Sequence, residues 1–96
     1  MNGLTLVILT PEGEACRFPC EAVTVFARDN EAGEGGGSVG IRRGHIPALI
    51  ALEPGSAVKA RAEGGSESRY KISRGFAAVK DDTVTVAAEA AERITD

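Results

Sequence analysis

The chain has 96 residues, which is enough for one domain with a single core. Its hydrophobic fraction is 43% and its charged fraction 26%, values typical of a globular domain and not of a disordered chain. The net charge is −3 at pH 7, and only 4% of the residues are aromatic. This composition argues against nucleic acid as a partner, because nucleic-acid binding needs a concentrated basic surface or stacking aromatic side chains.

Apolar residues alternate with a period of two along most of the chain, and this pattern predicts β-strands. The expected strands are residues 4–10, 14–18, 21–27, 39–41, 48–52, 57–61, 68–72, 76–79 and 83–86. Turn signals lie between them, such as residues 11–13, 63–66 and 80–82. About nine short strands at a spacing of about ten residues predict an all-β sandwich or barrel.

Two segments differ from this pattern. Residues 28–38 are polar and rich in glycine, and we expect a long mobile loop there. Residues 87–93 have a helix-forming composition but are too few for a stable isolated helix. We therefore divide the chain into a β-sandwich domain over residues 1–88 and a C-terminal stub over residues 89–96, whose composition also allows a helix.

Motifs for catalysis or cofactor binding are weak. Residues 35–40 match the G-x-G-x-x-G pattern of dinucleotide-binding turns, but Gly44 and Pro47 oppose the helix that must follow such a turn. We therefore expect no cofactor. Cys16 and Cys20 would lie about 13 Å apart in an extended strand, beyond the reach of a disulfide unless Pro19 turns the chain. Small buried hydrophobic residues are the preferred interpretation of both cysteines.

Four segments, in register over nearly the whole chain, resemble the epsilon subunit of F-type ATP synthases. Residues 40–55 are similar to that family's Gly-x-x-x-Gly-His-x-Pro-x-Leu-x-x-Leu-x-Pro-Gly segment. The other three similar segments are residues 6–13, 72–79 and 84–93. The resemblance implies a flattened β-sandwich of about ten short strands, in agreement with the strand pattern.

The resemblance also implies a function. Epsilon subunits are non-catalytic parts of the central stalk, and they link the gamma subunit to the c-ring. The implied gamma-subunit interface includes Thr10, His45 and Ile50, with Ile50 expected on an exposed face. The implied c-ring interface includes Ser38, Arg42 and Arg43. Such a subunit couples proton or sodium movement to ATP synthesis or hydrolysis. It lies at the cytoplasmic face of the bacterial inner membrane and contacts the membrane only through the complex.

The chain departs from the family pattern at several positions. Ser38 stands where the family often has an acidic residue, Arg43 where it has a proline, and Arg74 where it has a glycine. The sequence also ends where the family usually continues into two C-terminal helices, so a short form is expected. Two alternatives stay open: a stand-alone β-sandwich protein-binding module, and a small enzyme or metal protein built on Cys16, Cys20 and His45.

Overall fold

The computed structural model describes residues 3–28 and 37–94, and these form ten β-strands. The strands are β1 (Leu4–Thr10), β2 (Gly13–Cys20), β3 (Ala22–Ala27), β4 (Gly37–Arg42), β5 (Ala48–Leu52), β6 (Ala57–Arg61), β7 (Glu67–Ile72), β8 (Gly75–Lys80), β9 (Thr83–Ala88) and β10 (Ala91–Ile94). The predicted all-β fold is confirmed. In the described parts of the chain, no segment forms an apolar helix of the length that a membrane crossing needs.

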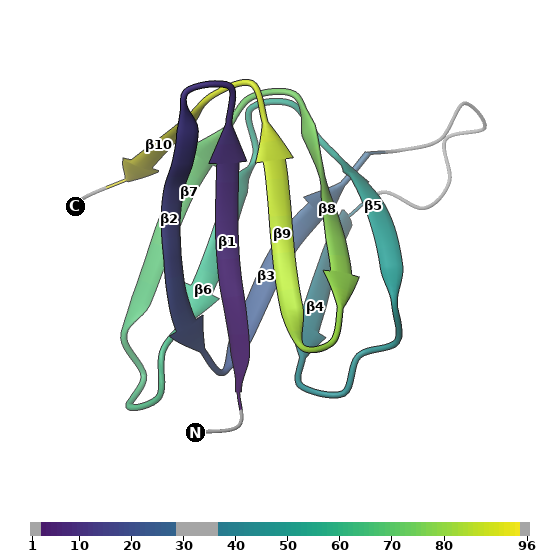
Figure 1. Cartoon of the computed structure of the whole chain (residues 1–96), viewed down its shortest axis with the longest axis vertical. Helices are drawn as coiled ribbons and strands as arrows, with labels where there is room; N and C mark the ends of the chain where they lie inside the picture. Colours follow the sequence, from purple (N-terminus) through teal and green to yellow (C-terminus); the bar gives the residue numbers. More distant parts are fainter. Residues whose placement is uncertain (1–2, 29–36, 95–96) are drawn as a thin grey trace.

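The strands form two layers that face each other across one core (Figure 1). The hydrogen-bonded order is β10-β7-β6-β3-β5-β8-β9-β1-β2, and β4 pairs with β3 outside this path. The front layer of Figure 1 contains β5, β8, β9, β1 and β2, and the back layer contains β10, β7, β6, β3 and β4. Among the described residues, β3 and β5 share one register pair, Ala27 and Leu52, so the sheet passes from one layer to the other there.

The core contains the side chains that point inward from both layers. Leu6 and Ile8 of β1, Val23 of β3, and Val84 and Val86 of β9 are fully buried. They alternate with more exposed residues along β3 and β9, as expected for strands with one face in the core. The alternation fixes which residues of each strand face outward.

Residues 91–94 do not form a helix. Ala91–Ile94 form β10, which pairs antiparallel with β7 from Ala91 opposite Ile72 to Ile94 opposite Arg69. The helix-forming composition of this segment is overridden because pairing with β7 satisfies backbone groups that a short isolated helix leaves open. Most of the predicted loop at residues 28–38 lies outside the described residues, although Gly37 and Ser38 belong to β4 and not to a loop.

Gly75 is required by close packing between β8 and β9. A Cβ atom built on Gly75 would overlap the carbonyl oxygen of Ala87 and lie 2.8 Å from Cα of Ala88. Both neighbours are backbone atoms of β9, so they cannot move aside as a flexible side chain would.

We expect Gly75→Ala to lower the free energy of unfolding by about 1–3 kcal/mol, because the methyl group must force two paired strands apart. Gly40→Ala is the matched control, since a Cβ atom there meets nothing within 4 Å, and it should change stability by less than about 0.5 kcal/mol. Urea unfolding of the two variants measures both values. Equal effects would contradict this account.

Candidate protein-binding face

One face of the sandwich exposes apolar side chains. It consists of the outward-facing residues of β1, β9, β8 and β5, and we call it the outer apolar face. Leu9, Ala87, Phe76 and Ala51 lie side by side across these four strands, because each is the register partner of the next. A second row contains Val7, Thr85, Ala78 and Leu49, and in this row Val7 is only 3% exposed.

This face carries almost no charge. Among the described residues, Lys80 at the end of β8 is the one charged side chain that β1, β5, β8 and β9 direct outward. Leu49 is 72% exposed and Phe76 49% exposed. An antiparallel sheet with one free face usually covers it with polar side chains, so a contiguous apolar face indicates a surface that a partner covers.

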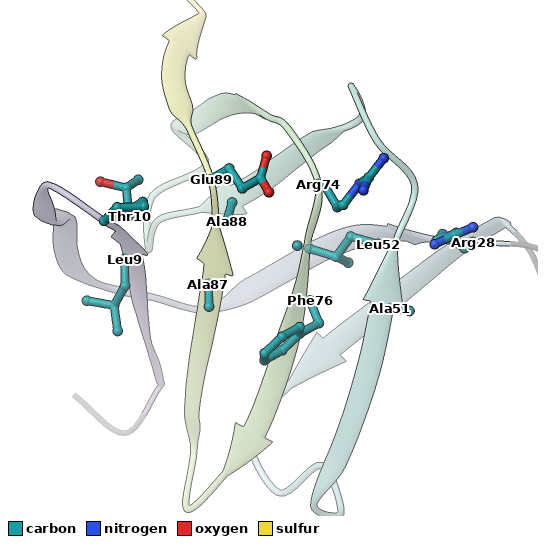
Figure 2. Close-up of a pocket in the computed structure, with 12 residues that line it drawn as sticks. Leu9, Thr10, Arg28, Ala51, Leu52, Arg74, Phe76, Ala87, Ala88 and Glu89 are labelled. Carbon is teal, nitrogen blue, oxygen red and sulfur yellow. The ribbon is translucent and has the colours of Figure 1, made fainter.

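The upper part of the face is hollowed (Figure 2). The hollow has a volume of about 610 Å³ and is open to solvent. Leu9, Phe76 and Ala87 contribute apolar lining, whereas Arg28 and Arg74 lie at one side of it in Figure 2. A wide, open and mainly apolar hollow fits a side chain of a partner protein better than a small molecule, which is usually enclosed on most sides.

The predicted gamma-subunit residues do not form one cluster. Thr10 lies at the end of β1 and lines the hollow, and its hydroxyl accepts a hydrogen bond from the amide of Glu12 at 3.2 Å. His45 is half-buried in the turn between β4 and β5, at the other end of the face. Its Nδ1 lies 2.7 Å from the carbonyl oxygen of Ile46. Thr10 and His45 therefore mark opposite ends of the outer apolar face.

The prediction that Ile50 lies on the exposed face is wrong. Ile50 is half-buried and packs against the core, and in β5 it alternates with the exposed residues Leu49 and Ala51. The sequence could not distinguish the two faces of β5, because residues 48–52 are all apolar and show no alternation. Leu49 was missed for this reason. The register of β5 with β8 places Leu49 on the same face as Phe76, which the sequence analysis also did not single out.

The predicted c-ring residues lie on the back layer. Ser38 and Arg42 both face outward from β4, opposite Phe26 and Ala22 of β3. Four residues of extended chain place them about 13 Å apart. Arg43 follows in the turn to β5, close to Arg42 and far from Ser38. The structure therefore spreads these residues along β4 and does not gather them at one loop.

The turn between β4 and β5, which contains Arg43 and His45, is hydrogen-bonded to the turn of the β8–β9 hairpin. The amide of Gly44 donates a 2.7 Å hydrogen bond to Oδ1 of Asp82 in the β8–β9 turn. Asp82 and its neighbour Asp81 have φ values of 59° and 53°, in the left-handed region that non-glycine residues rarely adopt. This turn geometry directs β9 back along β8, as in a two-residue hairpin. The bond keeps the turn of residues 43–47 at the lower edge of the front layer.

The structure does not support a site built on Cys16, Cys20 and His45. Among the residues it describes, no three histidine, cysteine, aspartate or glutamate side chains are grouped as metal ligands. Both cysteines are free thiols on β2, where Cys20 is buried in the core and Cys16 packs against it. Burial raises the pKa of both thiols above the ordinary value of 9.0, and it also raises the pKa of Tyr70, which is hydrogen-bonded to Cys16.

These raised pKa values predict a loss of stability in alkaline solution. Between about pH 9 and the raised values, the unfolded chain releases thiol protons that the folded chain keeps. The unfolded state then binds fewer protons, so the free energy of unfolding falls as the pH rises.

We expect Cys20→Ala to be less stable than the parent chain at pH 7 by about 1 kcal/mol, because it leaves a small cavity. Its melting temperature should nevertheless fall less between pH 7 and about pH 10, because one of the buried thiols is gone. Thermal melts at both pH values test this expectation. An equal fall in the two proteins would show that the buried thiol of Cys20 does not cause the alkaline loss.

A β-sandwich with an exposed apolar sheet face is typical of domains that pack against another protein. Comparison with known proteins identifies the protein family. The family model of the ATP synthase delta/epsilon chain β-sandwich domain matches residues 3–94, so the chain belongs to this family. The prediction of an accessory subunit, not a catalytic one, is confirmed by this family.

Individual relatives agree. The chain is 38% identical over 92 residues to the ATP synthase epsilon chain of Staphylococcus saprophyticus. This match covers 96% of this chain and 63% of the relative. It is 33% identical over 96 residues to the epsilon chain of Anoxybacillus flavithermus, of which it covers 65%. The chain thus spans less than two thirds of the length of these relatives.

A solved structure has the same fold. It is a chain of the Euglena gracilis mitochondrial ATP synthase, in a complex described as OSCP/F1/c-ring, and it matches with a TM-score of 0.77 and 28% sequence identity. The match covers 97% of this chain and 54% of the other. The recognition of an epsilon-type β-sandwich is confirmed by both sequence and fold.

Proposed function

We propose that this domain is a central-stalk module of a rotary ATP synthase, that its outer apolar face binds the gamma subunit, and that it links gamma to the c-ring. In this role it transmits rotation between the ring and the stalk and so couples ion movement to ATP synthesis or hydrolysis. The observation that carries the proposal is the outer apolar face, which is almost free of charge over four strands and belongs to a domain of the delta/epsilon family. The site would lie at the cytoplasmic face of the membrane, with membrane contact only through the complex.

The extent of the face supports a long contact with gamma. Thr10 and His45 lie at its two ends, so an interface that includes both must run along the strands of the front layer. Leu49 and Phe76 lie between these ends, and Phe76 is the bulkiest side chain of the upper row. Large apolar side chains near the centre of an interface commonly carry most of its binding energy. Ile50 would then support the interface from the core side and would not contact gamma directly.

Leu49→Asp is expected to weaken gamma binding by at least about tenfold, because a carboxylate must be buried in a dry apolar contact. The variant should keep its melting temperature, since the side chain of Leu49 is 72% exposed in the isolated domain. Ile50→Asp, one residue away on the opposite face, should instead destabilise the fold. Binding to purified gamma subunit and thermal melts of the same samples give both readouts.

Three outcomes would contradict this proposal. Leu49→Asp could bind gamma normally, which would move the interface elsewhere on the domain. Ile50→Asp could stay folded and lose binding, which would restore the original assignment of Ile50 to the contact. The parent domain could fail to bind gamma while binding another protein, which would favour the stand-alone binding module.

The c-ring contact is proposed along β4. Ser38 and Arg42 face outward from this strand at positions about 13 Å apart, so a contact that includes both must extend along it. Because Ser38 is uncharged where the family often has an acidic residue, Arg42 and Arg43 make this surface positive, and they favour carboxylates on the ring side.

Single cysteines at positions 38 and 43 test this arrangement, in a chain whose Cys16 and Cys20 have been changed to alanine. In the assembled complex, both Ser38→Cys and Arg43→Cys should cross-link to the c-ring with a short reagent. Lys71→Cys, on β7 of the same layer, is the control and should not cross-link. Cross-linking at only one of the two positions, or equally at position 71, would refute a contact along β4.

A further inference from the structure

Two arginine side chains border the hollow of the outer apolar face. Arg28 directly follows β3 and Arg74 directly precedes β8, and both side chains are exposed. Both line the hollow with Phe76, and they lie on the side away from Leu9 (Figure 2). The strands around the hollow direct almost no charge outward, so these two cations give an otherwise apolar hollow one positive side.

The backbone of both arginines is held by the strands that frame the hollow. The amide of Arg28 donates a 2.9 Å hydrogen bond to the carbonyl oxygen of Ala51, so Arg28 extends the row that contains Ala51 and Phe76. The carbonyl oxygen of Arg74 accepts a 3.1 Å hydrogen bond from the amide of Glu89. A fixed backbone limits the space that the two guanidinium groups can sample, and this lowers the entropy cost of binding a partner group between them.

The carboxylate supplied by this chain does not balance the two cations. Among the described residues that line the hollow, Glu89 carries the one carboxylate, against the guanidinium groups of Arg28 and Arg74. In Figure 2 the side chain of Arg74 points away from Glu89. Within residues 3–28 and 37–94, no ion pair joins Glu89 to either arginine. This side of the hollow therefore keeps a positive potential that attracts an acidic group of a partner.

Arg74 makes the positive side a feature of this particular chain. It stands where the related epsilon pattern has a glycine, directly before Gly75. A glycine at position 74 would leave Arg28 as the one cation on this side of the hollow among the residues that the structure describes. A second guanidinium raises affinity for a partner that carries the complementary charge and lowers it for one that does not.

We propose that Arg28 and Arg74 together bind one carboxylate of the gamma subunit, from an aspartate or glutamate next to the apolar side chain that fills the hollow. This inference rests on the proposed binding of gamma to the outer apolar face, and it adds the chemistry that gamma must present there. Guanidinium groups donate paired hydrogen bonds that match the two oxygens of a carboxylate. The apolar contact around Phe76 keeps water away from this ion pair, which strengthens it.

Binding of purified gamma to variants of the whole domain tests the proposal. Arg28→Gln and Arg74→Gln should each weaken binding at least about fivefold at low salt, because each removes one of the two guanidinium groups. Lys59→Gln, on β6 of the back layer, removes the same charge and should change binding by less than about twofold. The variant with both arginines changed should depend less steeply on salt concentration than the parent domain. Melting temperatures of the arginine variants should stay within a few degrees of the parent, because both side chains are exposed.

A cross-link identifies the carboxylate directly. Carbodiimide coupling joins a lysine amine to a carboxylate that touches it and adds no spacer between them. In the complex with gamma, the Arg74→Lys variant should couple at position 74 to an aspartate or glutamate of gamma, which mass spectrometry of the linked peptides identifies. Arg74→Gln has no amine at this position, so the same linked peptide should be absent.

The outcomes separate this inference from the proposed function. If Leu49→Asp abolishes gamma binding while both glutamine variants bind like the parent domain, gamma covers the face without an acidic contact and this inference alone is overturned. It is also overturned if Lys59→Gln weakens binding equally, or if Arg74→Lys couples to no carboxylate of gamma. If the parent domain does not bind gamma at all, both are wrong.

A small anion is the other occupant that two arginines could hold. Inorganic phosphate should not bind the free domain with a dissociation constant below about 1 mM. If it does, and if the glutamine variants lose phosphate but keep gamma, the two arginines form a site for a free anion and the proposal is wrong.

Discussion

The structure depends on one packing constraint: the two layers of the sheet share a single set of buried side chains. Each strand must supply alternate residues to this layer, so a shift of one residue would turn every inward side chain outward. Fully buried residues such as Leu6, Val25 and Val84 therefore fix the register of β1, β3 and β9. Once the inward positions are fixed, the composition of each outer face is fixed as well, and it can differ between the two layers without disturbing the core.

The alternating pattern predicts most of this fold from sequence. The hairpins of β6 with β7 and of β8 with β9 join strands that are close in sequence, with glycine or aspartate at the turns. Local patterns cannot predict which strands meet over long distances. The pairing of β1 with β9 and that of β3 with β4 decide which side chains become neighbours, and nothing in the separate segments encodes them.

The prediction of the site was limited in the same way. Residues 48–52 are uniformly apolar, so neither periodicity nor family resemblance shows whether Leu49 or Ile50 faces outward. The register of β5 with β8 decides this. Thr10 and His45 were predicted for the gamma-subunit interface from the family resemblance, and their separation at two ends of one face required the three-dimensional arrangement. At residues 91–94 the sequence suggested the wrong structure: their composition favours a helix, but pairing with β7 makes them a strand.

The contact between β1 and β9 has a consequence for how the domain is made. β1 is the first strand of the chain, and its parallel partner β9 lies far away in sequence, with Thr5 opposite Thr83. During synthesis the hairpin of β1 and β2 would emerge from the ribosome long before β9, so one edge of β1 stays unpaired until nearly the whole domain has been translated. Contacts between residues so distant in sequence slow folding, because the intervening chain loses entropy before the contacts form. The front layer would therefore close late, and the newly made chain would depend on chaperones or on rapid completion to keep that open edge from pairing with other chains.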